Sequence, residues 1–89
     1  MKRIKGVSRH AQRQTIRRKA PAMTPKRLVR ALKRGKARIE PAFSGRWAFF
    51  YRGFVYITNP EKDIIISVLT EEEFRNQRGQ QLGILKFMV

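Results

Sequence analysis

One histidine and a few arginines are the side chains of this sequence best suited to chemistry on a phosphate group. Cleavage of RNA without a metal ion needs a group that takes the 2′-hydroxyl proton, a group that protonates the leaving oxygen, and cations around the charged phosphorane. Histidine suits the proton transfers because its ordinary charge change falls closest to neutral pH. The candidate for the acid or base is His10. The candidates for stabilising the phosphate are Arg13 together with Arg46 or Arg52, and Ser67 or Thr70 could position it.

Each of these side chains also has a structural alternative that involves no chemistry. His10 can cap or pack within a basic helix, and Arg13 with Arg17 can form a solvated helix face. Thr70 stands three residues before Glu73, a spacing that fits a capping box at the start of a helix. The sequence leaves the catalytic and the structural roles open side by side.

The charge of the chain is very uneven. Its 89 residues include 21 Lys and Arg but only six Asp and Glu, which gives a net charge of +15. Fifteen of the cations lie in the first 38 positions, and every acid lies at Glu40 or later. Such a charge repels itself unless an anionic partner shares the field. The length fits one domain, so we expect a single domain over residues 1–89, with residues 1–7 as a flexible basic arm.

Several classes of protein are excluded by what the sequence lacks. Because there is no cysteine, a disulfide framework, a Cys-ligated metal and a thiol nucleophile are all excluded. A single histidine argues against a transition-metal site, and we expect no cofactor. No apolar run approaches the roughly 20 residues that span a bilayer, and the basic start leads into no apolar stretch. We therefore expect a cytoplasmic chain that does not enter a membrane.

Two helices are predicted in the basic half. Ser8 caps the first, which runs to about residue 19 and has Val7, Ala11 and Ile16 as a narrow apolar stripe. Thr24 followed by proline starts the second, which ends at about residue 35. Its inward stripe consists of three apolar side chains: Leu28, Val29 and Leu32.

The outer faces of these helices are cationic. Like charges stacked at i and i+4 destabilise a helix, so a face of them suggests an anionic ligand. The predicted nucleic-acid contacts comprise two arginines of the first helix and five cations of the second: Arg9, Arg17, Lys26, Arg27, Arg30, Lys33 and Arg34.

The second half of the sequence is typical of strands. Residues 47–51 and 54–58 are rich in aromatic and β-branched side chains and flank Arg52 and Gly53, which indicates a tight hairpin. Its aromatic side chains are expected mainly to form the core, and the alternative is that they stack on exposed bases. A further strand is predicted over residues 63–69, with residues 64, 66 and 68 on one face. Residues 37–42 and 82–89 are weaker strand candidates, and the capping box at Thr70 predicts a helix to about Gln77, broken at Gly79. The fold class is therefore α+β, with two N-terminal basic helices packed on one antiparallel sheet of three to five strands.

A short motif in the first helix resembles a known family. The run Ser8, Arg9, His10, Ala11 resembles the S-x-H-A-x-x-R opening of small phage- and plasmid-type proteins in the superfamily of barnase, colicin and RelE-like ribonucleases, although Gln14 holds the place of the arginine. The resemblance extends over roughly residues 7–70, with a second helix ending in glycine and strands that close on a hydroxyl residue. It implies a toxin-like ribonuclease that acts on RNA without a metal ion.

Two other functions stay open beside this one. A non-catalytic protein could hold RNA or DNA through backbone charge alone, because phosphate contacts need no special residue. A phage-type inhibitor could use the same basic face to bind an acidic host protein. Among nucleic acids the expectation is RNA over DNA, and the oligomeric state is not predicted.

Overall fold

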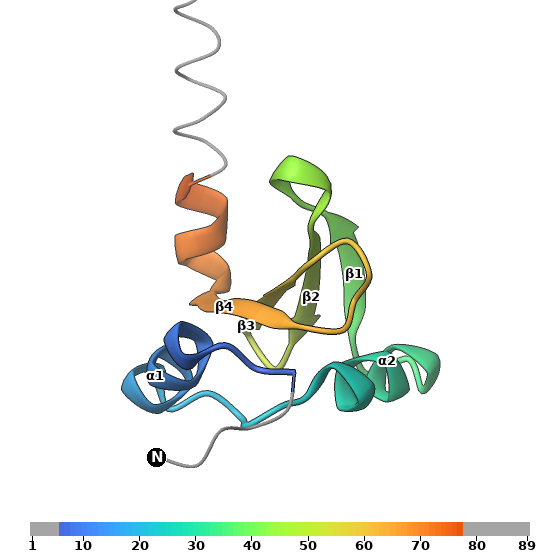
Figure 1. Cartoon of the computed structure of the whole chain (residues 1–89), viewed down its shortest axis with the longest axis horizontal. Helices are drawn as coiled ribbons and strands as arrows, with labels where there is room; N and C mark the ends of the chain where they lie inside the picture. Colours follow the sequence, from blue (N-terminus) through green and yellow to red (C-terminus); the bar gives the residue numbers. More distant parts are fainter. Residues whose placement is uncertain (1–5, 78–89) are drawn as a thin grey trace, which may run out of the picture.

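The structure, a computed structural model, describes residues 6–77 and centres on a four-stranded antiparallel sheet. Two helices come first, α1 (Arg9–Arg18) and α2 (Pro25–Lys33). The strands follow as β1 (Arg38–Pro41), β2 (Trp47–Tyr51), β3 (Phe54–Thr58) and β4 (Ile65–Thr70), with a single turn of 3₁₀ helix, Phe43–Gly45, before β2. Residues 71–77 are helical again. The predicted α+β class is confirmed, and the strands lie in the order β1-β2-β3-β4 (Figure 1).

The hairpin of β2 and β3 has the bounds and the turn that the sequence predicted. Trp47 pairs with Thr58 and Tyr51 with Phe54, so only Arg52 and the glycine after it remain in the turn. Both turn residues have a positive φ, 50° and 82°, as a two-residue turn matched to the twist of the strands requires. The hairpin is thus determined by short-range signals.

Hydroxyl caps start both helices where the sequence predicted them. Ser8 Oγ accepts a hydrogen bond from the backbone N–H of Ala11 at 3.0 Å, and Thr24 Oγ1 accepts one from that of Arg27 at 3.2 Å. At the other end of α1, Lys19 adopts a left-handed conformation with φ 53°. The chain therefore leaves α1 ahead of Pro21, as expected.

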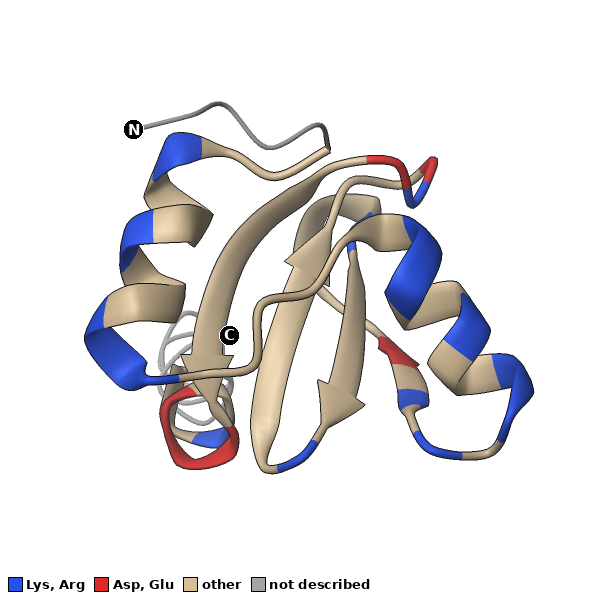
Figure 2. Cartoon of the chain, turned by 90° about the horizontal axis from the view of Figure 1, so that it is seen from below, with Lys and Arg blue, Asp and Glu red and all other residues tan. Residues whose placement is uncertain are grey.

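Both helices contribute to the core on one face of the sheet. Ala11 of α1 and Leu28 of α2 pack with Phe49 and Tyr56 of the central strands, and all four are essentially inaccessible to solvent. The Tyr56 hydroxyl donates to the Pro21 carbonyl at 2.6 Å, and burial raises the pKa of this hydroxyl well above its usual value. Figure 2 shows α1 and α2 at opposite sides of this face, with the connecting residues 19–24 crossing between them.

A second cluster lies on the other face of the sheet. Phe50, Val55 and Leu69 pack there with Phe74 from the helical residues 71–77. The Phe50 and Phe74 rings meet edge to face with centroids 5.5 Å apart. The last described helix is therefore held against the sheet by an aromatic contact.

The buried side of α1 differs from the predicted apolar stripe. Ile16 is 66% exposed, whereas Gln12 and Gln14 are buried beside Ala11. Of the predicted stripe, Ala11 is buried and Val7 packs against the core, so the prediction was wrong for Ile16 alone. The glutamines are buried because α1 lies along the edge strand β4, where unpaired backbone groups, and not only apolar side chains, need partners.

Gln14 closes the edge of β4. Its Oε1 accepts the backbone N–H of Val68 at 2.7 Å, and Ser8 Oγ donates to the carbonyl of Ile66 at 2.9 Å. Just before α1, the backbone N–H of Ser8 donates to the carbonyl of Ile65, and the N–H of Ile65 donates to that of Gly6. Side chains and backbone of the N-terminal segment together take the place of a fifth strand.

The predicted alternation of residues 63–69 was also wrong. The pairing of β3 with β4 shifts beside Ile57, so Ile66 is an extra residue in the ladder. As a result Ile65 and Val68 belong to the same core cluster, while Ile64 is 43% exposed. The periodicity of a strand predicts its faces only where its pairing is regular.

Some predicted features fall outside the described residues. The expected strand over 82–89, the break at Gly79 and residues 1–5 of the basic arm all lie there. The rest of that arm is described, and its Val7 forms a parallel bridge with Ile65.

Replacing Gln14 by leucine keeps the size of the side chain and removes the acceptor of the Val68 N–H. A buried donor left unpaired is destabilising, so we expect the free energy of unfolding to fall by about 1–3 kcal/mol. Arg13→Leu introduces the same residue at the exposed neighbouring position and should change it by less than about 0.5 kcal/mol. Chemical denaturation measures both, and equal losses would contradict the role given to Gln14.

Candidate functional site

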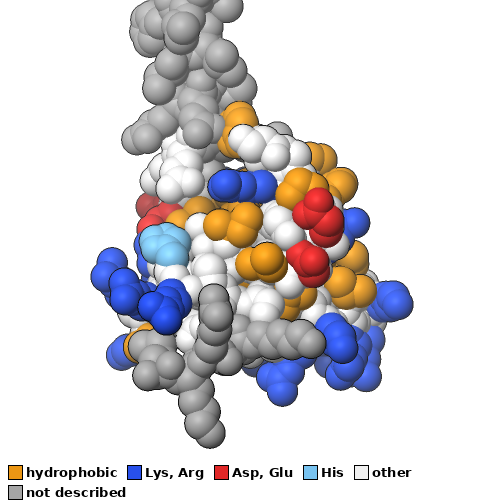
Figure 3. All heavy atoms as spheres, in the orientation of Figure 1, with side chains coloured by type: hydrophobic (Ala, Val, Ile, Leu, Met, Phe, Trp, Pro, Cys, Tyr) orange, Lys and Arg blue, Asp and Glu red, His pale blue; other side chains and the backbone are white. Residues whose placement is uncertain are grey.

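The outer surface of α2 carries a dense group of cationic side chains. Leu28 points into the core, so the four cationic residues of the helix turn outward, and they are exposed, as is Arg34 at the C-cap. Figure 3 shows Lys and Arg side chains gathered at two separate places, one over α1 and one over α2. At α2, two grooves are lined by cations of the helix and of neighbouring residues.

The first groove lies between α2 and the loop that joins β3 to β4. It has a volume of about 340 Å³. Pro25 and Val29 supply its apolar wall. Its cations come from three positions of α2 and one of the loop: Lys26, Arg30, Lys33 and Lys62.

The second groove lies on the opposite flank of α2, toward the end of β2, and has a volume of about 270 Å³. Its neutral lining includes Met23 and the aromatic Tyr51. Its cations are three arginines of α2 with its C-cap and one lysine beyond it: Arg27, Arg30, Arg34 and Lys36. Since Arg30 lines both grooves, the two form one continuous cationic surface across α2, here called the α2 surface.

No acidic residue within residues 6–77 lines either groove or forms an ion pair with the cations of the α2 surface. The ion pairs of this part of the chain involve other arginines: Arg18 with Glu73, Arg38 with Glu40 and Glu71, and Arg75 with Glu71. Glu61 and Asp63 flank Lys62 in the sequence, and the seven cations of the α2 surface still leave it with an excess of positive charge.

The first helix presents a simpler arrangement. Arg9, Arg13 and Arg17 follow one another at steps of four residues and are all exposed, as is His10. The spacing of four places the three arginines in one row along the helix. Figure 2 shows the blue segments of α1 mainly on the side of the helix away from the sheet. At the last position of the S-x-H-A-x-x-R motif this chain has Gln14 in place of arginine. Gln14 is buried against β4 and faces away from the row of arginines.

The predicted catalytic residues are spread over the fold. Arg46 precedes β2 and Arg52 follows it, so about 20 Å of strand separates them. Thr70 lies at the end of the sheet where Arg52 is, because it pairs with Phe54 just after the turn. His10 lies near the start of α1. Arg18, the last residue of α1, binds Glu73 beside Thr70, and His10 is about 12 Å from Arg18 along the helix axis. The structure thus brings Arg52 and Thr70 to one end of the sheet and leaves Arg46 at the other.

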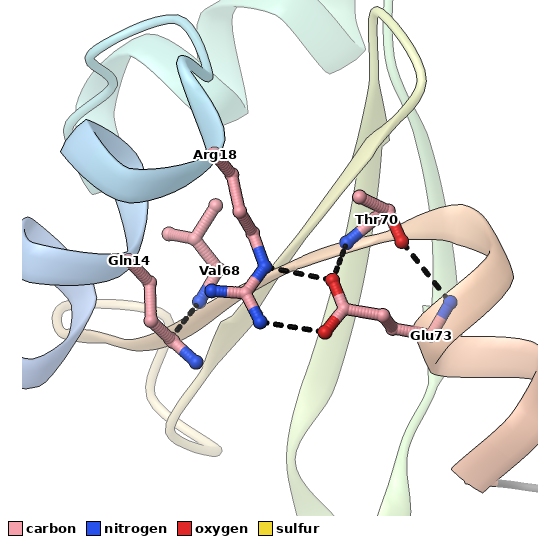
Figure 4. Close-up of polar contacts among 5 residues, drawn as sticks. All are labelled: Gln14, Arg18, Val68, Thr70 and Glu73. Carbon is pink, nitrogen blue, oxygen red and sulfur yellow. Dashed lines mark hydrogen bonds and ion pairs between the residues drawn. The ribbon is translucent and has the colours of Figure 1, made fainter.

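Thr70 has the structural role that the capping box predicted. Its Oγ1 accepts the N–H of Glu73 at 3.1 Å, and Glu73 Oε1 accepts the N–H of Thr70 at 3.0 Å (Figure 4). The hydroxyl therefore starts the last described helix.

Arg18 joins this cap to α1, a contact that the sequence did not predict. Its Nε and Nη2 donate to the two carboxylate oxygens of Glu73 at 2.7 and 2.6 Å. The guanidinium lowers the pKa of Glu73 to about 2, and the carboxylate raises the pKa of Arg18. The available signal was the spacing of Ala11, Gln14 and Arg18, which places all three on one side of a helix.

Comparison with family models, with curated proteins and with solved structures finds no match for this chain. The resemblance to RelE-like ribonucleases therefore stays a prediction. Within residues 6–77 no group of three or more His, Asp or Glu side chains lies close enough to hold a metal ion. In the same range no helix is long and apolar enough to cross a membrane.

The pKa of Glu73 predicts how stability depends on pH. Because the folded value is lowered from 4.5 to about 2, the bridge stabilises the fold above pH 4.5 and its contribution is lost as the pH falls toward 2. The carboxylate is 39% exposed, so solvent screening limits this contribution to about 1 kcal/mol. In Glu73→Gln we expect the stability to fall at neutral pH and this part of the acid dependence to vanish.

The matched control for Glu73→Gln is Glu72→Gln, which removes the same charge from the preceding, exposed position. Denaturation at a series of pH values should show the full acid dependence in this control. An unchanged acid dependence in Glu73→Gln would contradict the assignment.

Proposed function

We propose that this protein binds the phosphate backbone of a nucleic acid through the α2 surface. The observation that carries the proposal is the pair of grooves that share Arg30 and together hold seven cations and no acid of the described residues. Adjacent cationic grooves on one helix suit a ligand with regularly repeated negative charges.

The side chains of the α2 surface have the chemistry for phosphate. The planar guanidinium group presents paired donors that match two oxygens of one phosphate, and lysine adds a point charge. Binding an anion would also relieve the repulsion among like charges that follow one another along α2. The first helix, with its row of exposed arginines, would extend the same electrostatic field.

Binding is favoured over cleavage by the positions of the predicted catalytic residues. His10 lies at the end of α1 away from Arg18. Arg18 binds Glu73 of the Thr70 cap, and the Thr70 hydroxyl is engaged in that cap. Phosphate contacts, in contrast, need only the charges that the α2 surface assembles. The family resemblance favours RNA over DNA as the ligand, and both belong in the test.

Two triple variants with the same change of charge test the location of the site. Lys26, Arg30 and Lys33 changed to glutamine alter the α2 surface, whereas Arg9, Arg13 and Arg17 changed to glutamine alter the row on α1. All six positions are exposed, so both variants should fold. With single-stranded oligonucleotides we expect the α2 variant to lose at least about tenfold in affinity and its salt slope to fall by about 2, and the α1 variant to lose clearly less.

Measurement of affinity against salt concentration for wild type and both variants decides between the possibilities. Equal losses in the two variants would mean that net charge matters and the grooves do not. Wild-type affinity that is independent of salt would exclude phosphate contact altogether and would favour an acidic protein as the partner.

The separation of the catalytic candidates predicts binding without cleavage. Wild type and His10→Ala, each incubated with labelled single-stranded RNA in EDTA, should bind alike and leave the RNA intact. Binding and cleavage are followed in the same samples. Cleavage by the wild type that is lost in His10→Ala would instead establish a metal-independent ribonuclease with His10 at its centre.

A further inference from the structure

Of the two grooves beside α2, only the second is lined by an aromatic side chain. The first has Pro25 and Val29 as its neutral lining, whereas the second has Tyr51. Phosphates alone would be held by the cations of either groove. An aromatic ring among four cations suits a ligand that carries a flat π-system next to its negative charge.

Tyr51 is well placed to offer such a contact. It is the last residue of β2 and is only partly buried, in contrast to Phe49 and Phe50 before it. Its backbone is held by pairing with Phe54 across the two-residue turn. The side chain packs in part against the core at the end of a paired hairpin, so little conformational entropy would be lost when a ligand binds.

A neighbouring arginine strengthens the electrostatics of this position. The Arg52 guanidinium lies over one face of the Tyr51 ring, with its carbon 5.2 Å from the ring centroid, so a base would contact the other face or the edge of the ring. The cations of α2 line the same groove as Tyr51. The ring thus stands between the charges of the turn and those of the helix.

We infer that the second groove binds one nucleotide unit of a single-stranded nucleic acid, with a base against Tyr51 and its phosphates on Arg27, Arg34 and Lys36. The inference rests on the proposed function and deepens it. In a duplex the faces of the bases are stacked on one another, so only a single strand offers a base face to a ring in a groove.

Three variants of the full chain test the role of the ring. Tyr51→Leu removes it, Tyr51→Phe keeps the ring without the hydroxyl, and Phe54→Leu removes the ring of its cross-strand partner, which packs in the same core cluster but lines neither groove. For a strand of about 12 nucleotides we expect Tyr51→Leu to lose roughly 5- to 100-fold in affinity, the effect of one lost base–aromatic stack. The other two variants should bind like wild type.

The ligands are single-stranded RNA, single-stranded DNA, a duplex and an abasic oligomer of equal length. Wild type should bind both single strands more tightly than the abasic oligomer, and Tyr51→Leu should not distinguish them. Equal affinity of wild type and Tyr51→Leu for the single strands would overturn the inference. A loss in Tyr51→Phe as large as in Tyr51→Leu would also overturn it, because the hydroxyl and not the ring would then make the contact.

A measurement on the wild type makes the test independent of the folding of any variant. A single strand that carries 5-iodouracil, irradiated in the complex, should cross-link to Tyr51, which peptide mapping identifies. Cross-links confined to other residues would overturn the inference. If the α2 triple variant loses affinity while Tyr51→Leu does not, only this inference fails; if the α2 triple variant binds like wild type, the proposed function itself fails.

Discussion

The open edge of β4 is the constraint on which the arrangement of this fold depends. An edge strand exposes backbone donors and acceptors that need partners, and here the partners come from the start of the chain. Ser8 and Gln14 bond to the backbone of β4 from α1, and Gly6 pairs with Ile65 ahead of it. These contacts place α1 along β4, with a buried side that is largely polar.

The position of α1 determines where α2 can go. Because α2 leads directly into β1, at the opposite edge of the sheet, the connection between the helices has to cross the sheet face. Tyr56 holds this connection by donating to the Pro21 carbonyl from the middle of the sheet. Leu28 of α2 is buried in the core, so the cations of the helix lie at the surface, with a groove on each flank.

Three of the acids, Glu40, Glu71 and Glu73, form ion pairs with arginines outside the α2 surface. Glu73 binds Arg18 and links the last described helix to α1, while Glu71 lies close to Arg38 and Arg75. The excess charge is therefore not spread evenly over the molecule. A surface of this kind attracts polyanions, and the aromatic Tyr51 beside it gives the second groove a chemistry that charge alone lacks.

The sequence by itself determined the caps and turns that form through contacts between neighbouring residues. The caps at Ser8 and Thr24, the Arg52–Gly53 turn and the capping box of Thr70 all arise from contacts within a few positions, so their residues could be read directly. The uneven charge was likewise visible in the composition.

The tertiary structure alone decided which distant residues meet. The burial of Gln14, the exposure of Ile16 and the bulge in β4 depend on the pairing of segments that lie more than 50 positions apart or on a shifted register. The same holds for the pairing that brings Thr70 to the Arg52 end of the sheet and for the place of Tyr51 in a groove of α2. Local periodicity carries no information on such contacts, because they join segments that are distant in the sequence and meet only in the folded chain.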